Sequence, residues 1–446
     1  MKKSVLFSGI FVFVLIGFLY IYYYPRLGIA TGFASKMVCS CHFISGRDKD
    51  EIKKNVLHHS ILPYVQIDIN EAEKSVTSSF FGLKKKSAYY KNGVGCVLSP
   101  NGQRPDFVYT RNDVMFDEDT LASDFEWVEG VTSGVDKQKL MSVVETAFDD
   151  GKTFSEKRTS TVLVIHRDTM IAEMYAPPVH KDMPQLGWSM TKSLINTFAG
   201  LMVLNGKVDP AQNSLFPEWQ NDERKNITLN DLLFMNSGLE WNEDYEKVSD
   251  VTSMLYESPN VAVIPLSKKL GHKPATFWMY SSGTSNLVSK YLRDRFGNDE
   301  AYHSYMYRRL FKPLGMESVI METDATGNYI GSSYTFATAR DWAKFGMLYK
   351  NNGMWMGKRI LPQHWVQYTT SEAQGSDGQY GAHFWLGKNS KTFPSAPKDM
   401  FYADGYQGQF VLIIPSYDLV IVRLGYSDFD ADTFLKKILE VIPERS

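Results

Sequence analysis

Apolar residues gather in two distant parts of the chain, and each part predicts a pair of adjacent strands. Residues 162–165 and 170–175 are mostly apolar and flank a polar turn at residues 167–169. Residues 410–414 and 419–422 repeat this arrangement around residues 415–418. Short apolar runs bounded by turn residues are typical of buried strands in hairpins. The two hairpins therefore predict one antiparallel sheet assembled from distant parts of the chain.

Helical periodicity predicts the elements that cover this sheet. Apolar positions recur at helical spacing over residues 139–148 and again over residues 430–441. The long stretch between the hairpins is expected to be mainly helical. We therefore expect an α+β fold in which residues 131–446 form the main domain. Residues 25–130, with strand-like runs at 61–69 and 94–98, are expected to form an accessory segment.

The N-terminus carries a long apolar segment. Residues 4–24 contain no charged side chain, follow Lys2 and Lys3, and end in several tyrosines. A helix of this length rises about 30 Å, which is enough to cross the hydrocarbon core of a membrane. We expect a transmembrane anchor at 4–24 in preference to a cleaved signal peptide. Residues 1–3 would be a cytoplasmic tip, and the body would lie on the extracytoplasmic (periplasmic) side.

Composition and cysteine content narrow the possible partners. The chain has 446 residues and a net charge of −2, which argues against a nucleic-acid partner. It has three cysteines, Cys39, Cys41 and Cys96. A disulfide from Cys96 to Cys39 or Cys41 is plausible in an oxidising compartment, and three unpaired cysteines are an equal alternative. Without suitably spaced histidines these residues do not predict a zinc site, and no metal is expected.

Ser189 and Lys192 form the first candidate catalytic pair. Three positions apart at the start of a helix, they lie on one helix face. A serine hydroxyl needs a nearby base to become a nucleophile, and a lysine can be that base when burial lowers its pKa. The helix start also offers backbone N–H groups to a developing oxyanion. Ser395 and Lys398 have the same spacing but enclose Pro397, and we expect a loop there.

Two further motifs follow along the chain. Tyr280, two residues before Ser282, could share a proton with the Ser–Lys pair, although a buried aromatic beside a helix cap is an alternative. Residues 404–409 then lead into the strand at 410–414. Gly408 would let a substrate approach this strand, and the Gln409 backbone N–H could be a second oxyanion donor. The alternative is an ordinary turn into a strand.

The order of these motifs resembles that of class C β-lactamase-related serine hydrolases, a penicillin-binding-protein-like family. This family includes D-alanyl-D-alanine carboxypeptidase-like enzymes, esterases and 6-aminohexanoate-dimer hydrolases. Residues 232–239, 313–316 and 338–346 are similar to further family signatures. The resemblance extends from about residue 135 to the C-terminus. It implies a β-lactamase/transpeptidase-like α+β fold, with an antiparallel sheet of about five strands flanked by helices, a helical lobe, and no cofactor.

The resemblance also implies roles for the matching residues. Ser189 would be the nucleophile, Lys192 the base and Tyr280 the proton shuttle. The residues expected to bind substrate are Ser282, Tyr406, Gln407, Gly408, Gln409, Tyr245 and Asp250. Where β-lactamases usually carry Lys-Thr-Gly, this chain has residues 406–408, which lack the cation that holds a substrate carboxylate.

These observations predict a membrane-anchored serine hydrolase that acts on a small-molecule or peptide-like ester or amide through an acyl-enzyme. Esterase or amidase activity is expected in preference to β-lactam hydrolysis. The alternative is a slow or inactive penicillin-binding-like protein that binds a cell-wall-type ligand. His383 is expected to be a packed histidine and not a catalytic one.

Overall fold

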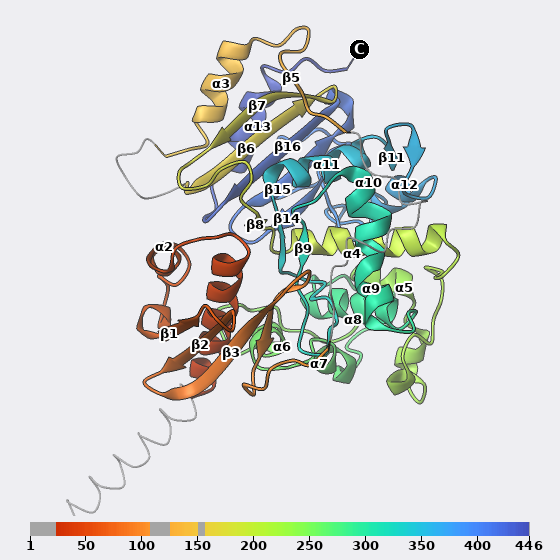
Figure 1. Ribbon diagram of the computed structural model, residues 1–446. Helices are drawn as coiled ribbons and strands as arrows, with labels where there is room; N and C mark the ends of the chain where they lie inside the picture. Colours follow the sequence, from red (N-terminus) through yellow and green to blue (C-terminus); the bar gives the residue numbers. More distant parts are fainter. Residues whose placement is uncertain (1–23, 108–124, 150–156, 446) are drawn as a thin grey trace, which may run out of the picture.

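The computed structural model describes residues 24–107, 125–149 and 157–445, and its largest element is a sheet with strand order β13-β14-β15-β16-β6-β7-β5 (Figure 1). The strands are β5 Val128–Glu129, β6 Thr159–His166, β7 Thr169–Tyr175, β13 Trp385–Leu386, β14 Phe401–Gly405, β15 Gln409–Ile414 and β16 Leu419–Gly425. Every neighbouring pair is antiparallel except β5 and β7. The five longer strands include both predicted hairpins, and the predicted antiparallel sheet of an α+β fold is confirmed.

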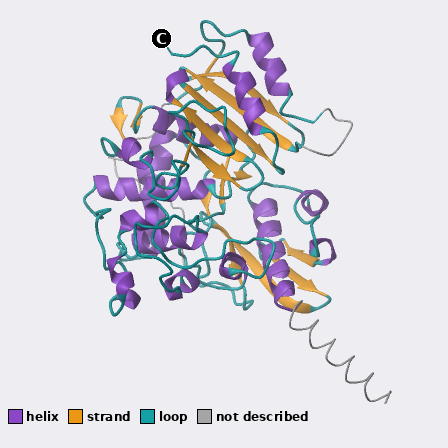
Figure 2. Cartoon of the chain, turned by 180° about the vertical axis from the view of Figure 1, so that it is seen from behind, coloured by secondary structure: helices purple, strands orange, loops and turns teal. Residues whose placement is uncertain are grey.

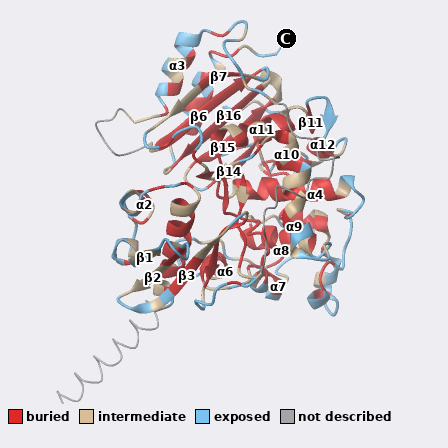
Figure 3. Cartoon of the chain, viewed as in Figure 1, coloured by how far each residue is buried: buried red, intermediate tan, exposed pale blue. Residues whose placement is uncertain are grey.

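Helices cover both faces of this sheet. The helices α3 (Lys137–Glu145) and α13 (Ala431–Leu439) pack on one face, and α11 (Ala339–Lys350) packs on the other. Along β6, Val162 and Val164 belong to the apolar core on the α3 and α13 face, whereas Leu163 and Ile165 belong to the core on the α11 face. Because both faces are buried, the strand is a continuous apolar run without alternation. Figure 3 shows the resulting burial along β6, β15 and β16.

The segment between β7 and β13 forms the predicted helical lobe. Its helices are α4 Met190–Leu204, α5 Leu229–Leu233, α6 Asp250–Tyr256, α7 Val263–Ser267, α8 Ser282–Arg293, α9 Asp299–Met306, α10 Lys312–Leu314 and α12 Trp365–Thr369. Short strands accompany them: β8 Gln185–Leu186, β9 Ile320–Met321, β10 Thr335–Ala337, β11 Met354–Trp355 and β12 Lys358–Arg359. Helix α4 is buried along most of its length and contacts α8 and the strands β14 and β15. It therefore lies at the junction of lobe and sheet.

Residues 24–107 form an N-terminal unit with a sheet of its own (Figure 2). Residues 24–43 are helical and are followed by α2 (Lys49–Asn55). The sheet is an antiparallel meander of β1 Gln66–Asn70, β2 Ser75–Phe80, β3 Leu83–Lys91 and β4 Gly95–Ser99. The predicted strand-like run at 94–98 lies in β4, whereas the run at 61–69 is strand only from residue 66, in β1, because Leu62–Tyr64 forms a 3-10 helix.

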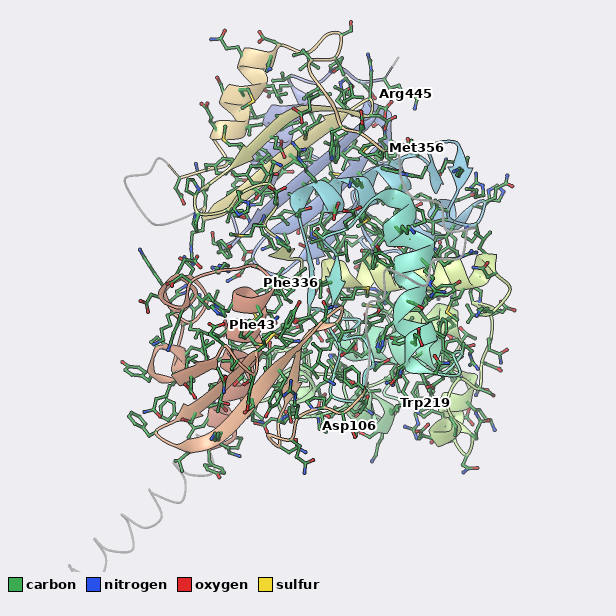
Figure 4. All side chains as sticks on the ribbon, viewed as in Figure 1. Phe43, Asp106, Trp219, Phe336, Met356 and Arg445 are labelled. Carbon is green, nitrogen blue, oxygen red and sulfur yellow. A yellow bond between two sulfur atoms is a disulfide. The ribbon has the colours of Figure 1, made fainter. Side chains whose placement is uncertain are left out.

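One apolar cluster joins the N-terminal unit to the helical lobe. It contains Val38 and Ala88 from the N-terminal unit, and Trp188, Tyr256 and Tyr334 from the main domain. Phe43, which Figure 4 labels at the end of the first described helix, packs against this cluster. The two units therefore share a continuous core.

The predicted disulfide is confirmed with Cys39 as the partner of Cys96. The bond joins helix 24–43 to β4, and its two cysteines are 57 positions apart in the sequence. Cys41 is free and buried. The alternative of three unpaired cysteines is wrong.

The predicted membrane localisation requires a correction. Within residues 24–107, 125–149 and 157–445, we find no helix with the length and hydropathy needed to cross a bilayer. For this part of the chain, the expected single-pass membrane localisation is wrong. The helix over 24–43, which follows the predicted anchor, packs inside the protein, where residues 34–41 are buried, including the charged Lys36. The predicted tip at 1–3 and anchor at 4–24, except Tyr24, lie outside the described residues.

Candidate active site

Ser189 lies at the N-terminus of the central helix α4 and is half-buried. The turn that leads into it is held tightly: the Gly187 N–H donates to the Thr335 carbonyl (2.8 Å), and the Thr191 hydroxyl donates to the Trp188 carbonyl (2.8 Å). Trp188 has a φ of 47°, a conformation that side chains adopt at a cost and that surrounding contacts must maintain. The turn therefore presents the Ser189 hydroxyl from a fixed backbone.

Lys192 lies one turn along α4 and contacts Ser189 directly. Its Nζ donates to Ser189 Oγ (2.9 Å), to Ser282 Oγ (3.2 Å) and to the carbonyl of Ser332 (2.9 Å). Burial lowers the pKa of Lys192 to about 8, against the opposing influence of Glu243 and Asp404. No carboxylate of the described residues lies within ion-pair distance of it. A lysine in this state can give up its proton near neutral pH.

Tyr280 completes the contacts of the Ser189 hydroxyl. Its phenol lies close enough to Ser189 to influence its own pKa, and its ring centroid lies 4.8 Å from the Nζ of Lys192. Trp385 stacks on this ring at 5.5 Å. Burial raises the pKa of Tyr280 well above its ordinary value, so the phenol keeps its proton at neutral pH. The structure thus brings together the three residues predicted to be catalytic.

A carboxylate that the sequence analysis missed lies beside this group. Glu243 accepts hydrogen bonds from the Ser282 hydroxyl (2.5 Å), the Ser282 N–H (2.9 Å) and the Trp241 indole. The Tyr245 phenol contacts both Ser282 Oγ (3.2 Å) and Glu243 (3.3 Å). Ser282 and Tyr245 therefore lie at the site, and Glu243 orients them. Its only sequence signal was its place between Trp241 and Tyr245.

Asp250 and His383 lie in different surroundings. Asp250 forms an ion pair with Lys268 (2.6 Å) and accepts from the Asn242 N–H (3.0 Å). These contacts fix the loop before α6, and no contact joins the described side chain of Asp250 to Ser189. His383 is buried between the Lys192 carbonyl (3.1 Å) and Ser285 (3.2 Å). Burial lowers its pKa to about 3, as expected for a packed neutral histidine.

The third motif approaches the nucleophile at Gly405, three residues before the predicted Gly408. A Cβ on Gly405 would collide with the carbonyl oxygen of Gly187, in the turn before Ser189. Gly408 lies in the β14–β15 turn, where Arg423 donates to its carbonyl (2.8 Å) and to that of Gln407 (2.8 Å). The strand therefore packs against the nucleophile turn at Gly405, and the approach of a substrate at Gly408 stays a prediction.

The remaining residues of this motif divide between the turn and the site. Gln409 pairs with Gly405 in the β14–β15 ladder. Its side chain forms hydrogen bonds with the backbone of Tyr406 and Gly425, and these bonds hold the side chain within the hairpin. The Tyr406 ring is 59% exposed and packs edge-on against Trp188 (5.6 Å), beside Ser189. Asp404 is half-buried on β14, and burial raises its pKa to about 7.

The chemistry available at this site is that of a hydroxyl, an amine and a phenol. Among the described residues, no group of three or more His, Cys, Asp or Glu side chains is placed to hold a metal ion.

The central helix α4, held between a helical lobe and one end of an antiparallel sheet, defines a β-lactamase/transpeptidase-like fold. This is the fold that the sequence resemblance implied. Residues 147–436 match the family model described as Beta-lactamase, and the chain belongs to the β-lactamase family.

Comparisons with individual proteins support the family branch that the motifs indicated. The chain is 24% identical over 296 residues to a 6-aminohexanoate-dimer hydrolase of Paenarthrobacter ureafaciens, covering 60% of this chain and 73% of that protein. A Bacillus anthracis structure provisionally named a 6-aminohexanoate-dimer hydrolase has a TM-score of 0.58 and 17% identity, covering 89% of this chain and 96% of that one. A family VIII carboxylesterase structure has a TM-score of 0.51 and 14% identity, with coverage of 68% and 97%. The protein is therefore a β-lactamase-fold hydrolase related to 6-aminohexanoate-dimer hydrolase, and it shares its fold with a carboxylesterase.

Proposed function

We propose that the protein is a serine hydrolase that cleaves an ester, amide or peptide-like bond through an acyl-enzyme on Ser189. The observation that carries this proposal is the 2.9 Å contact between Lys192 Nζ and Ser189 Oγ, made by a buried lysine with a pKa of about 8. An amine in this state accepts a proton from a serine hydroxyl, whereas an ordinary surface lysine does not.

The geometry supports a two-step reaction. Ser189 Oγ attacks the substrate carbonyl while its proton passes to Lys192, and the Ser189 N–H at the start of α4 stabilises the oxyanion. Tyr280 passes a proton to the leaving alcohol or amine as the tetrahedral intermediate collapses. Water then attacks the acyl-enzyme, with the same groups accepting its proton. The backbone at the end of β14, which reaches Gly187 through Gly405, is the candidate for the second oxyanion donor.

The strand beside Ser189 supports a substrate without a carboxylate at this position. If Gly405 takes the place of the motif glycine instead of Gly408, residues 403–405 are Ala, Asp and Gly, so the lysine position holds an uncharged alanine and the next position adds an acidic side chain. A penicillin-type carboxylate would meet Asp404 without a compensating charge. Short esters and amides fit better, in agreement with the names of the hydrolase relative and the carboxylesterase neighbour.

The test is covalent labelling with a fluorophosphonate probe, followed by turnover assays. Wild-type protein should be labelled, Ser189→Ala should not, and Ser395→Ala, the second Ser-x-x-Lys serine, should be labelled like wild type. We expect cleavage of p-nitrophenyl butyrate with little or no nitrocefin turnover. Equal labelling of Ser189→Ala and wild type contradicts the proposal. A burst of p-nitrophenol without further turnover would instead favour the slow penicillin-binding-like alternative.

A further inference from the structure

A buried ion pair connects the N-terminal unit to the main domain. Lys36 Nζ lies 2.9 Å from Glu322 Oε2, and the two side chains are 1% and 0% exposed. Glu322 also accepts from the Ser40 hydroxyl (2.8 Å) and from the Cys96 N–H (2.5 Å). Lys36 in turn donates to the Cys96 carbonyl. Three groups of the N-terminal unit therefore hold one carboxylate of the main domain, next to the disulfide of Cys96 with Cys39.

The backbone of Glu322 holds the segment 330–335 in place. The Glu322 N–H donates to the Tyr334 carbonyl (3.0 Å), and the Ile330 N–H donates to the Glu322 carbonyl (3.0 Å). Any movement of Glu322 is thus transmitted to both ends of this segment.

The same segment holds both proposed catalytic groups. The Ser332 carbonyl accepts from Lys192 Nζ (2.9 Å). The Thr335 carbonyl accepts from the Gly187 N–H (2.8 Å), two residues before Ser189. Segment 330–335 therefore links the buried ion pair to the base and to the turn that carries the nucleophile.

An aromatic contact provides a second link. Lys36 Nζ lies 4.7 Å from the centroid of the Tyr334 ring, and that ring lies 5.6 Å from Trp188, the neighbour of Ser189. Tyr334 and Trp188 have φ values of 62° and 47°. Such left-handed conformations persist only where neighbouring contacts over-determine them.

We propose that the N-terminal unit positions the nucleophile and its base, with Lys36 and Glu322 as positioning residues. This inference rests on the proposed function, because their placement matters only if Ser189 and Lys192 react. Buried ion pairs are weak sources of stability, so a fully buried pair at this place points to a geometric role. A displacement of the reacting groups by about 1 Å can reduce a rate about a hundredfold.

The experiment compares Glu322→Gln with the double variant Lys36→Met/Glu322→Gln, which leaves no unpaired charge. The matched control is Lys86→Met, because the Lys86–Glu257 pair (2.7 Å) also joins the two units but does not contact residues 330–335. The measurements are kcat and KM for p-nitrophenyl butyrate, the rate of fluorophosphonate labelling, and Tm. Glu322→Gln should lose about ten- to hundredfold in kcat and in labelling rate, with KM changed less than about twofold.

The double variant separates positioning from stability. We expect the Tm of the double variant to return close to that of the control Lys86→Met. The control should keep wild-type kcat, whereas the kcat of the double variant should stay about tenfold or more below wild type. Recovery of kcat together with Tm would overturn the inference, as would wild-type kcat in Glu322→Gln. If these variants do not fold, Ser40→Ala removes one donor to Glu322, and an unchanged labelling rate there would also overturn it.

The two proposals fail in different ways. Wild-type protein that is not labelled at Ser189 contradicts the proposed function. Labelling of wild type at Ser189 with equal rates in Glu322→Gln and the double variant contradicts only the positioning role.

Discussion

Two buried lysines, one in each unit of the molecule, have different partners. Lys36 and Lys192 are each 1% exposed. Lys36 contacts the carboxylate of Glu322, whereas Lys192 contacts two hydroxyls and a carbonyl. Burial lowers the pKa of both, and only for Lys36 does a directly bonded carboxylate oppose the shift. The comparison teaches that a buried lysine becomes a potential base through its lack of a contacting carboxylate, and not through burial alone.

Replacing Lys192, the proposed base of the two lysines, by Arg should give the largest loss of kcat. Arginine keeps the positive charge but does not lose a proton near neutral pH, so it cannot act as a base. We expect kcat for p-nitrophenyl butyrate to fall about a thousandfold, within the range that general bases contribute. Lys86→Arg, which keeps a charged partner for Glu257, is the control and should retain kcat. A Lys192→Arg enzyme with more than a tenth of wild-type kcat contradicts the role of Lys192.

The pH profile should sharpen the comparison by locating the proton of Lys192. Since the pKa of Lys192 falls from 10.5 to about 8, its neutral, basic form is present above pH 8 and is lost as the pH falls below it. We expect kcat/KM to rise with pH around a midpoint of about 8.

A substitution near Lys192 tests the same assignment. Glu243 raises the pKa of Lys192, so Glu243→Gln should move the kcat/KM midpoint to lower pH, by up to about one unit. Glu240→Gln, in the same loop and exposed, should leave the midpoint unchanged. A shift to higher pH, or a flat wild-type profile between pH 6 and 9, would argue against Lys192 as the titrating base.

Removing the disulfide should weaken the region around Lys36. Because the bond spans 57 positions, its loss in Cys39→Ser/Cys96→Ser should cost roughly 2–4 kcal/mol in the free energy of unfolding. Urea unfolding of the oxidised variants measures this cost, with Cys41→Ser as the control for burying a hydroxyl in the same helix. Equal losses in the two proteins would mean that the bond itself adds little.

A partly exposed lysine pair should show the smallest effect. Lys268 and Asp250 lie 2.6 Å apart, with side chains 23% and 24% exposed. In Asp250→Asn, we expect a loss of at most about 1 kcal/mol in unfolding free energy and a KM within about twofold of wild type. A several-fold rise in KM for p-nitrophenyl butyrate would instead support the substrate-binding role that the sequence pattern predicted for Asp250.

The large sheet was predictable because its strands are buried on both faces. Residues such as Val162 and Leu163 point to opposite cores, so the whole run is apolar and stands out from the sequence. The pairing of β5 with β7 and the shared core of the two units depend on contacts between distant residues, which no local pattern reports.

The catalytic group was predictable where spacing along one helix carried the information. Ser189 and Lys192 are three residues apart, but Glu243 reaches Ser282 only through tertiary folding. The third motif contains two glycines, Gly405 and Gly408, and only packing against Gly187 distinguishes them.

The salt link between Lys36 and Glu322 has a consequence for how the chain can evolve. The two residues lie in different units of the chain, so a recombination breakpoint between the units would bring each next to the other parent's sequence. Where the other parent lacks the partner residue, the fragment would bring an uncompensated charge into a dry interior. We therefore expect helix 24–43 and the segment around β9 to be inherited together, so that Lys36 and Glu322 change together or not at all. This is expected even though the family match begins only at residue 147.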